Sequence, residues 1–415
     1  MVTVVGLGFV GLTTALGFAE YGHKVYGIEA DPKRLHAIQN GKIPFLEPGL
    51  DGMLSRHLWR NFIPTSNWEQ SIADSECVYY CVGTPYGEDG SADLTYLYTA
   101  LDQTVQSIHD DKFRVLVTKS TIPPSTTEKY IIPFLKNHGM DIPKQLGVAN
   151  NPEFLREGHC WEDFTHADRI VLGISDPCSE EILQRLYAKA AAPVCCVSLN
   201  TGEFIKYLSN TSLACLISYA NEMSIAAEAI GGIDIAQAFR ILHMDKRWQT
   251  GSIRSYFYPG CGYGGYCLPK DAIAFYSRCR SSGVESQILK SVIDLNDAMP
   301  QVTAHRITRA VNGNKDACIG ILGLSFNPGS DDVRDTPSAK IIYALNEAGY
   351  QNIIAYDPVA IQAFQEHYFC TCRYTEMYDT LLEQADIAVI TTAWEMFSDI
   401  KMRFEKPVVD CRYML

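Results

Sequence analysis

The chain has 415 residues, of which 47% are hydrophobic and 20% charged, and a formal net charge of −13 at pH 7. At about 150 residues per domain, this length predicts two or three domains, and the composition excludes the disordered and fibrous classes. A chain this acidic, without a long Lys/Arg cluster, is a poor candidate for binding nucleic acid or an anionic membrane. Local donors could still hold a small anionic ligand against this overall charge.

The amino-terminal Met-Val-Thr-Val-Val leads straight into a glycine cluster, without the basic segment of a secretory signal. No uncharged apolar run reaches the ~18 residues that a membrane-spanning helix needs. The fourteen cysteines include no Cys-x-x-Cys pair, and the ten histidines show no zinc-ligand spacing. We therefore expect a reduced, cytoplasmic protein without a bound metal. Most cysteines are expected to be structural because they lie in apolar strand-like runs: Cys77, Cys81, Cys195, Cys196 and Cys318.

In the first half of the chain, short Val/Ile-rich runs alternate with amphipathic stretches, which is typical of strand–helix–strand units on a parallel sheet. The predicted strands are 2–5, 24–28, 77–82, 114–118, 146–150, 169–173 and 194–199. The predicted helices are 10–21, 32–39, 94–108 and 178–190.

Near residue 200 the pattern changes to one long helix. Asn200 to Glu203 resembles a capping box, and helix-compatible residues continue to Ile230, just before two glycines. This helix would be about 45 Å long at 1.5 Å per residue, so we expect it to connect domains or to mediate dimerisation. Further helix is expected at 234–243 and 269–312, on either side of a Gly/Tyr/Pro-rich loop at 258–268.

From Ala317 the alternation of strands and helices returns. Strands are predicted at 317–322, 352–356, 386–391 and 407–410, and helices at 337–348 and near 376–383. The predicted fold class is therefore α/β, with two Rossmann-like doubly wound domains joined by a helical middle that contains one long central helix. The expected domain boundaries are 1–199, 200–312 and 313–415.

A glycine turn, GLGFVG at residues 6–11, follows the first predicted strand and opens the first predicted helix. Glycines at this spacing allow a tight turn and close approach of the backbone to a pyrophosphate on the helix N-terminus. Glu29 ends the next strand, where a carboxylate would bind the two ribose hydroxyls. Glycines that serve only helix packing are the alternative, and this context argues against it. Because Glu29 is acidic and Arg34 follows only later in the chain, these residues favour NAD over NADP as the cofactor.

A second glycine-rich cluster, GYGGYCLPKD, occupies residues 262–271. It places Cys267 just ahead of a predicted helix whose first turn holds Lys270 and Asp271. A cysteine near a helix N-terminus and a lysine should have a lowered pKa, which makes its thiolate a usable nucleophile. One more structural cysteine is the alternative, but the polar glycine loop favours the functional interpretation.

Charged side chains also follow other predicted strands. Glu153 and Glu157 come after the strand 146–150 and could share one helical face, or could equally complement a helix dipole. The segment from Lys119 to Thr121 ends another strand, where a helix cap is the alternative.

Lys206 and Asn210 are four residues apart and project from one face of the long helix. On spacing alone, the favoured interpretation of this lysine is an exposed pair with Glu203. In the last domain, a polar loop could present Arg334 to a phosphate, and Arg412 follows the final strand. Either arginine could equally form a surface ion pair.

Seven segments, taken in order, resemble the UDP-glucose/GDP-mannose dehydrogenase family, most closely the branch that oxidises UDP-glucose. These segments are GLGFVG, CVGTP, KSTIPP, NPEFLREG, FIKYLSN, YGGYCLPKD and GLSFNPGSDDVRDTP. The resemblance covers nearly the whole chain, and YGGYCLPKD is its most specific motif. Its aromatic-Gly-Gly-Tyr-Cys form is more similar to the UDP-glucose enzymes than to the Gly-Gly-His-Cys form of the N-acetylmannosamine enzymes.

The resemblance implies oxidation of a primary alcohol to a carboxylate with two NAD⁺. Cys267 would attack the first-formed aldehyde and pass through a thiohemiacetal and a thioester. Lys206 and Asn210 would stabilise the oxyanion. Protons and the hydrolytic water would be managed by Glu153, Thr121 and Asp271.

The resemblance also implies two sets of binding residues. At NAD it places Gly6, Gly8, Phe9, Val10, Gly11, Glu29, Arg34, Val82, Gly83, Thr84, Pro85, Ser120, Thr121, Glu157, Lys270 and Arg334. At the nucleotide sugar it places Glu153, Phe154, Leu155, Arg156, Lys206, Asn210, Arg247, Tyr258, Gly262, Tyr263, Gly264, Phe326 and Arg412. Arg247 would reach the site of a neighbouring subunit, in a homodimer or higher homo-oligomer.

The chain departs from the family pattern at two positions. Asn327 stands where the family usually has Lys, and Cys411 stands in the usual Asp-Gly-Arg. The first change removes a positive donor from the sugar site, so UDP-N-acetylmannosamine or GDP-mannose remain alternative substrates.

A two-electron hydroxyacid dehydrogenase would have no use for Cys267. A catalytically silent nucleotide-binding protein is disfavoured because all the implied catalytic residues are present.

The arrangement of the domains is a further expectation. NAD would enter from the amino-terminal domain and the nucleotide sugar from the carboxy-terminal one, and the two would meet at Cys267. The helix at 200–230 would bridge these domains and pair two subunits.

Overall fold

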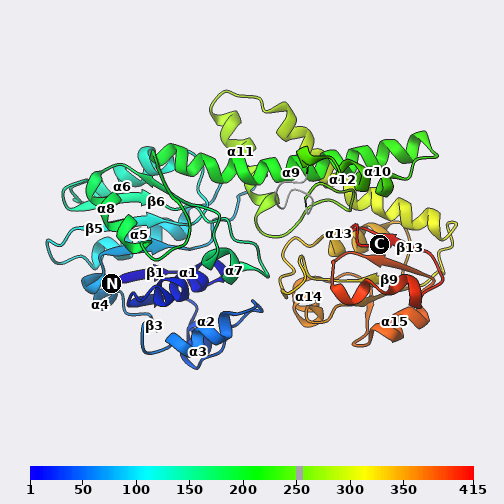
Figure 1. The fold of residues 1–415 in the computed structure, drawn as a ribbon, viewed down its shortest axis with the longest axis horizontal. Coiled ribbons are helices and arrows are strands. Elements are labelled where there is room, and N and C mark those ends of the chain that lie inside the picture. Colours follow the sequence, from blue (N-terminus) through cyan, green and yellow to red (C-terminus); the bar gives the residue numbers. More distant parts are fainter. Residues whose placement is uncertain (249–255) are drawn as a thin grey trace. The chain divides into compact units, whose positions relative to one another are not determined.

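The computed structural model describes residues 1–248 and 256–415, and the chain divides into two compact units (Figure 1). Unit 1 contains residues 1–209 and 273–282, and unit 2 contains residues 210–272 and 283–415. Helix α9 (Leu199–Ile230) and helix α11 (Leu268–Ser281) each contribute residues to both units.

Unit 1 is built on an eight-stranded sheet of order β3-β2-β1-β4-β5-β6-β7-β8. Its strands are β1 (Val2–Val5), β2 (Val25–Ile28), β3 (Phe62–Thr65), β4 (Cys77–Tyr80), β5 (Arg114–Thr118), β6 (Leu146–Asn150), β7 (Ile170–Ile174) and β8 (Val194–Val197). Its own helical segments are α1 (Phe9–Glu20), α2 (Pro32–Gln39), α3 (Leu50–His57), α4 (Trp68–Asp74), α5 (Thr95–Gln106), a π-helical turn (Thr127–Ile131), α6 (Ile132–Asn137), α7 (Cys160–Thr165) and α8 (Pro177–Leu186).

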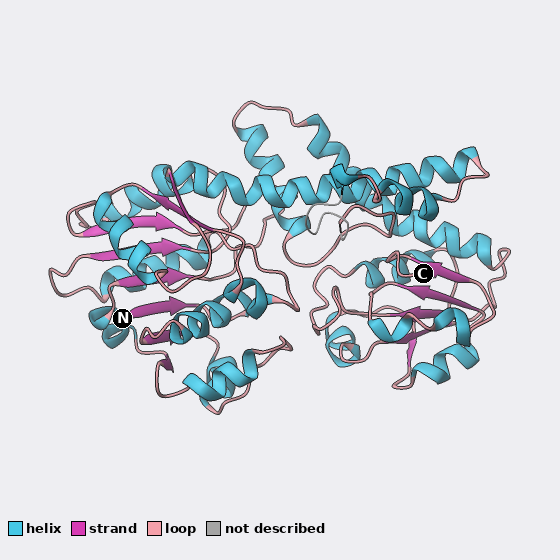
Figure 2. Cartoon of the chain, in the orientation of Figure 1, coloured by secondary structure: helices cyan, strands magenta, loops and turns pink. Residues whose placement is uncertain are grey.

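Helices cover both faces of this sheet (Figure 2) because its central strands are apolar on both sides. Val4 and Tyr79 pack into one core with α1 and α8, whereas Val5 and Tyr80 pack into a second core with α5 and α6. Successive residues of a strand point to opposite faces, so apolar runs of this kind require a layer of helices on each side.

The strand order of unit 1 reverses at β1, which lies between β2 and β4. In doubly wound sheets, ligands bind outside the carboxyl ends of the strands at such a point. The glycine turn at 6–11 follows β1 and the segment 81–85 follows β4, and β1 and β4 are paired in parallel. Both segments therefore lie at the same edge of the sheet.

Unit 2 contains a five-stranded parallel sheet of order β11-β10-β9-β12-β13, which repeats this reversal at β9. Its strands are β9 (Ile319–Leu322), β10 (Ile353–Tyr356), β11 (Arg373–Tyr374), β12 (Ile387–Ile390) and β13 (Val408–Asp410). Its own helical segments are α10 (Ile235–Leu242), α12 (Gln287–Ala310), α13 (Pro337–Glu347), α14 (Ile361–His367), α15 (Tyr378–Gln384), α16 (Ile400–Arg403) and 3-10 turns at Lys246–Trp248 and Glu395–Phe397. The predicted fold class, with two Rossmann-like sheets and one long helix, is confirmed.

The structure corrects several predicted elements. The sequence did not predict the short strands β3 and β11 or several short helices, among them α3, α4 and α7. Each of these elements is too short for its hydrophobic periodicity to be recognised. Strand β7 pairs antiparallel to β6 rather than parallel. The helix predicted at 269–312 is two helices, because Gly283 adopts a φ of +80°, in the left-handed region that favours glycine.

The capping box predicted at 200–203 is wrong. Ser198 caps α9 instead, since its Oγ accepts a hydrogen bond from the Thr201 N–H at 3.3 Å. Glu203 does not reach back to the helix start, because its carboxylate is buried against Thr127. A tertiary contact therefore takes the side chain that the local motif would have used.

None of the fourteen cysteines, all of which lie in the described residues, forms a disulfide. Cys77 and Cys318 are buried, but Cys195 and Cys196 are exposed. The strand prediction for Cys195 and Cys196 was correct, and their exposure follows from the position of β8 at the edge of its sheet.

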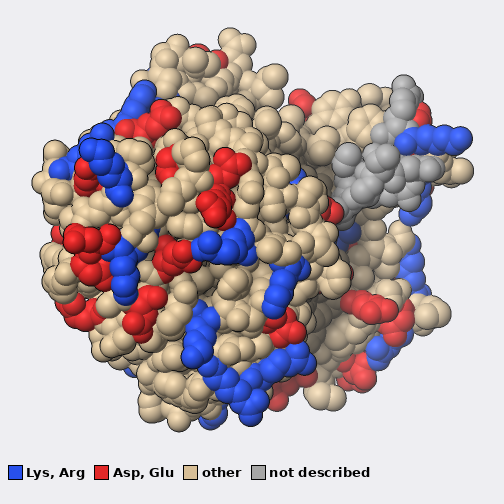
Figure 3. Space-filling view, turned by 60° about the vertical axis from the view of Figure 1, so that its left-hand side comes forward, with Lys and Arg blue, Asp and Glu red and all other residues tan. Residues whose placement is uncertain are grey.

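The surface in Figure 3 carries acidic and basic side chains interspersed with one another. The described part of this face has no broad basic patch that could bind a polyanion, which is consistent with the net charge of −13. Among the helices of the described residues, none combines the length and the apolar character needed to cross a membrane.

Candidate active site

The glycine turn after β1 is shaped for close approach of a ligand. Gly6 has a φ of +87°, and a Cβ on Gly11 would lie 1.7 Å from the Gly6 carbonyl oxygen. A Cβ on Gly8, in contrast, would meet no described atom within 4 Å. Gly8 is the N-cap of α1, and no side chain in the described residues caps this helix end. The first-turn N–H groups are therefore available to diphosphate oxygen atoms.

Glu29 lies directly after β2, beside this turn. The backbone N–H groups of Leu7 and Asp31 each donate to its carboxylate at 2.9 Å. The Arg34 guanidinium lies 3.3 Å from the same group. The predicted ribose-binding acid is therefore buried and held in one orientation by its neighbours.

Two hydrogen bonds join the loops that follow β4 and β5. Thr84 Oγ1 donates to the Thr121 carbonyl at 2.9 Å, and Ser120 Oγ donates to the Val82 carbonyl at 2.6 Å. These loops follow neighbouring parallel strands, so the predicted NAD residues at 82–85 and 120–121 lie together.

A buried ion pair joins Glu153, in the loop after β6, to Lys206 on α9. The distance between Lys206 Nζ and Glu153 Oε1 is 2.8 Å, and the side chains are 4% and 6% exposed, respectively. This geometry contradicts the exposed Lys206–Glu203 pair that spacing alone favoured. The Phe154 ring lies beside the pair, 5.6 Å from the Lys206 ammonium.

The charge of Glu153 is stabilised by its partners. Burial opposes ionisation, but the Lys206 ammonium, the Leu155 N–H and the Lys119 ammonium outweigh it and lower the pKa of Glu153. The expected helical face shared with Glu157 is absent, because residues 151–156 are not helical. The Glu153 carboxylate instead accepts the Leu155 N–H at 2.7 Å.

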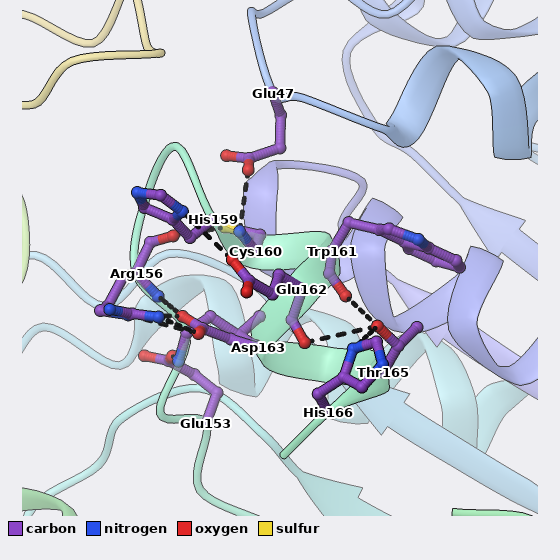
Figure 4. Close-up of polar contacts among 11 residues, drawn as sticks. Glu47, Glu153, Arg156, His159, Cys160, Trp161, Glu162, Asp163, Thr165 and His166 are labelled. Atoms are coloured by element: carbon purple, nitrogen blue, oxygen red, sulfur yellow. Dashed lines mark hydrogen bonds and ion pairs between the residues drawn. The ribbon is translucent and has the colours of Figure 1, made fainter. Parts of the chain in front are cut away.

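The same loop is fixed at its other end by acidic side chains (Figure 4). Arg156 faces Asp163, with Nη2 to Oδ1 at 2.6 Å and Nε to Oδ2 at 3.0 Å. Glu47 accepts the N–H groups of Gly158 and Cys160 at 2.9 and 2.8 Å, so a buried carboxylate caps α7. Burial raises the pKa of Glu47.

In unit 2, Cys267 occupies the position that precedes α11, and its carbonyl accepts the Asp271 N–H at 2.9 Å. The Asp271 carboxylate is fully buried between two donors, Asn210 Nδ2 at 2.7 Å and Lys270 Nζ at 2.5 Å. Burial opposes the charge of Lys270, but Asp271 and then Cys267 raise its pKa. The thiol therefore lies near a cation and ahead of a helix N-terminus, as the sequence predicted.

The glycines of the cluster at 262–271 allow tight packing within unit 2. A Cβ on Gly264 would lie 2.3 Å from the Asp335 carbonyl oxygen, and one on Gly265 would lie 2.6 Å from the Phe326 ring. Tyr263 is held by Asn296, whose side chain accepts its N–H at 2.7 Å and donates to its carbonyl at 3.1 Å. Gly264 and Phe326, which were both predicted to contact the nucleotide sugar, therefore lie close together.

The two arginines of unit 2 that the sequence singled out, Arg334 and Arg412, do not form simple surface ion pairs. Arg334 binds Asp332 and also lies over the Tyr266 ring, 4.3 Å from its centroid. Arg412 Nε donates to the Thr391 carbonyl at 2.5 Å, while its Nη2 is buried with no hydrogen-bond partner among the described residues. An orphaned buried donor of this kind suits an anionic or carbonyl ligand. Tyr258 stacks on Tyr413, with ring centroids 5.8 Å apart.

One predicted site residue, Arg247, is described only in part. The backbone of Arg247 lies in the 3-10 turn Lys246–Trp248, but its side chain lies outside the described part of the chain, so its predicted role stays a prediction. Sequence reasoning in turn did not single out Asn151 and Asn296, which hold the loops of both units. A lone asparagine carries no sequence signal, because its role depends on which carbonyl and amide groups the fold brings to it.

Comparison with known proteins gives the family. Models of three consecutive domains of the UDP-glucose/GDP-mannose dehydrogenase family match: the NAD binding domain at residues 1–191, the central domain at 200–298 and the UDP binding domain at 320–415. A UDP-glucose 6-dehydrogenase of Pseudomonas aeruginosa is 34% identical over 407 residues, which cover 95% of this chain and 88% of the relative. The chain belongs to the UDP-glucose/GDP-mannose dehydrogenase family.

Solved structures of the family agree. A UDP-glucose dehydrogenase from Pyrobaculum islandicum has a TM-score of 0.92 and 34% identity, covering 100% of this chain and 94% of that one. A UDP-D-ManNAc dehydrogenase from Pyrococcus horikoshii has a TM-score of 0.86 and 25% identity, covering 100% and 96%.

Membership of this dehydrogenase family makes NAD the cofactor, as predicted. The residues of unit 1 fit it. The open cradle at Gly8 admits a diphosphate, the first-turn N–H groups of α1 can bind its oxygen atoms, and the Glu29 carboxylate can accept ribose hydroxyls.

Proposed function

We propose that this nucleotide-sugar dehydrogenase is a UDP-glucose 6-dehydrogenase, which oxidises the C6 alcohol of UDP-glucose to the carboxylate of UDP-glucuronate. The observation that carries the proposal is the group around Asp271. Cys267 precedes α11 by one residue, and the Asp271 carboxylate in the first turn binds both Asn210 and Lys270. A thiol beside an ordered acid, amide and amine suits covalent capture of an aldehyde.

In this proposal, the glycine turn at 6–11 and Glu29 would hold NAD⁺, which would supply the hydride acceptor for each of two oxidation steps. Lys206 and Asn210 donate to the substrate oxygen as it gains negative charge. Glu153 and Thr121 position the water and accept protons, and Asp271 orients Asn210. Removal of a hydride and a proton from the alcohol gives an aldehyde.

Cys267 Sγ then bonds to the aldehyde carbon and its proton passes to the oxygen, which gives a thiohemiacetal. Loss of the second hydride and a proton leaves a thioester. Water adds to the thioester carbon, the C–S bond breaks, and the carboxylate and the thiol are released. Covalent capture is the reason for a nucleophilic thiol in an alcohol dehydrogenase, because it holds the intermediate for the second oxidation.

The choice of sugar rests on the similarity to UDP-glucose 6-dehydrogenases and on the residues of the UDP binding domain. Arg412, with its orphaned Nη2, and Phe326, against Gly265, are the proposed nucleotide-sugar residues. UDP-N-acetylmannosamine is the second candidate, because Asn327 replaces the usual family lysine and a UDP-D-ManNAc dehydrogenase shares the fold at 25% identity. We further propose a homodimer paired through α9.

The test is the stoichiometry of NADH against a panel of nucleotide sugars. With UDP-glucose we expect two NADH per sugar consumed, because the aldehyde stays bound to Cys267. A stoichiometry of one, with free aldehyde in solution, would falsify the covalent role. Faster turnover of UDP-N-acetylmannosamine would replace the proposed substrate while leaving the mechanism intact.

Variants of the cysteine sharpen this test. Cys267→Ala is expected to lower carboxylate formation at least about 1,000-fold, since the second oxidation loses its nucleophile. Cys267→Ser should retain a slow, trapped ester. Cys279→Ala, which removes a partly exposed thiol within α11, is the matched control and should act like the wild type.

A further inference from the structure

Asp357, directly after β10, carries a carboxylate that is enclosed by hydrogen-bond donors, and the residue is only 3% exposed. Its Oδ1 accepts the N–H groups of Val359 and Ala360 at 3.0 and 2.9 Å. Burying a carboxylate costs free energy unless donors compensate both of its oxygen atoms. The donors to the other oxygen, Oδ2, therefore decide what this carboxylate holds in place.

The Oδ2 atom of Asp357 joins the loops that follow β9 and β12. From the first loop, the N–H groups of Leu324 and Ser325 donate to it at 2.7 and 3.1 Å, and the Ser325 hydroxyl donates at 3.2 Å. From the second loop, the Trp394 indole N–H donates at 3.2 Å. Because β9 lies between β10 and β12 in the parallel sheet, one oxygen atom ties together three loops at the carboxyl edge of that sheet.

The two loops tied to Asp357 lead to the proposed nucleotide-sugar residues of unit 2. In the first loop, Phe326 directly follows Ser325. In the second loop, the Thr391 carbonyl accepts Arg412 Nε at 2.5 Å, and Arg412 Nη2 is the buried donor that has no partner among the described residues. Movement of either loop would therefore displace a side chain that is proposed to bind the nucleotide sugar.

Glu29 has the corresponding position in the sheet of unit 1. Each acid follows the strand that pairs in parallel with the first strand of its sheet. The Leu7 N–H donates to Glu29 at 2.9 Å, as the Leu324 N–H does to Asp357. The side-chain donor to Glu29 is the partly exposed Arg34 guanidinium, whereas the side-chain donors to Asp357 come from the two loops themselves. Unit 2 therefore uses for holding loops the acid that unit 1 is proposed to use for ribose.

We propose that Asp357 is a positioning residue for the nucleotide sugar, which holds the loops after β9 and β12 so that Phe326 and Arg412 can bind this ligand. Its carboxylate acts through the loops and does not touch the ligand. Removing the charge leaves buried donors with a poorer acceptor, so the loops would no longer be held in one arrangement. The inference rests on the proposed function for the roles of Phe326 and Arg412, but UDP binding can be measured without turnover.

The experiment replaces the carboxylate by an amide of similar shape, Asp357→Asn, which removes the charge and turns one acceptor into a donor. Asp386→Asn is the matched control. Asp386 Oδ2 accepts the Cys318 N–H at 2.9 Å just ahead of β12, and therefore at the opposite edge of the same sheet. Calorimetric titration of the full chain gives the Kd of UDP and of NAD, thermal unfolding gives the stability, and turnover gives the KM of UDP-glucose.

In Asp357→Asn, the Kd of UDP and the KM of UDP-glucose are both expected to rise at least about tenfold. The Kd of NAD should stay within about twofold of the wild type, because the NAD binding domain covers residues 1–191. Asp386→Asn should leave both Kd values within about twofold of the wild type. A carboxylate with a merely structural role would lower the unfolding temperature without weakening the binding of UDP.

A wild-type Kd of UDP in folded Asp357→Asn, or equal weakening of UDP binding in Asp386→Asn, overturns the proposal. If Asp357→Asn does not fold, the double variant Ser325→Ala/Trp394→Phe decides, because it removes both side-chain donors and leaves the carboxylate. UDP should then bind at least about threefold more weakly, and unchanged binding overturns the proposal. If the wild type binds UDP but produces no NADH from any nucleotide sugar, the proposed function fails, and the UDP titrations still report whether Asp357 positions the loops.

Discussion

Glu203 shows how one buried carboxyl can make stability depend on pH. Its Oε1 accepts hydrogen bonds from the Thr127 N–H at 2.8 Å and the Thr127 hydroxyl at 2.5 Å. Its Oε2 is buried without a hydrogen-bond partner among the described residues. Burial raises the pKa of Glu203 to about 7. The folded protein therefore keeps a proton on Glu203 at a pH where the unfolded chain has lost it.

The sign of the effect follows from this difference. A raised acid pKa means that the free energy of unfolding falls as the pH rises from about 4.5, and that the loss is complete above about 7. We compare the free energy of unfolding of Glu203→Gln, which cannot ionise, with that of the wild type. We predict that the difference shifts by about 2–3 kcal/mol in favour of Glu203→Gln when the pH is raised from 5 to 8. Chemical unfolding at both pH values measures this gain.

The matched control is Glu128→Gln, which changes an exposed carboxylate in the same turn. Its stability relative to the wild type should vary little with pH, because this variant and the wild type share the buried Glu203 carboxyl. Equal pH dependence of the two variants would show that burial of Glu203 does not control the effect.

At the scale of single elements, the turn between β1 and α1 contains two glycines with different tasks. A Cβ on Gly11 would overlap the Gly6 carbonyl oxygen at 1.7 Å, whereas a Cβ on Gly8 would meet no described atom within 4 Å. We predict that Gly11→Ala destabilises the protein by about 2 kcal/mol or more. Gly8→Ala should fold normally and bind NAD at least about tenfold more weakly, because its methyl group would stand where the diphosphate approaches.

Thermal unfolding and calorimetric titration with NAD separate these two outcomes. The two variants carry the same substitution in the same turn, so each controls for the other. If Gly8→Ala binds NAD with wild-type affinity, the glycine turn is not part of the cofactor site.

For the whole molecule, each α/β sheet is expected to respond to a different ligand. NAD should slow hydrogen exchange in residues 2–20 and around Glu29, because the NAD binding domain covers residues 1–191. UDP should slow exchange in residues 323–337 and 410–413, because the UDP binding domain covers residues 320–415. Mass spectrometry of the exchanged full chain measures both patterns. NAD protection confined to the segment 323–337 would contradict the assignment.

Much of this protein could be predicted from local patterns. Apolar runs separated by amphipathic stretches predicted both Rossmann-like sheets, because strand and helix periodicities reflect burial directly. The motifs GLGFVG and YGGYCLPKD predicted the glycine turn and the cysteine ahead of a helix, because close backbone approach restricts those positions to glycine. Such signals are contained within about ten residues, so no tertiary information was needed to read them.

Other features depend on contacts between distant residues, and only the tertiary structure decided them. Lys206 and Glu203 have the spacing of an exposed pair, yet the fold buries Lys206 against Glu153 and Glu203 against Thr127. Nothing in the sequence indicated that Lys119 is buried, because its hydrogen-bond partner, Asn151, lies 32 positions away in the sequence. The charge state of a buried group depends on its desolvation and on the charges that the fold places around it, and neither quantity is encoded in local spacing.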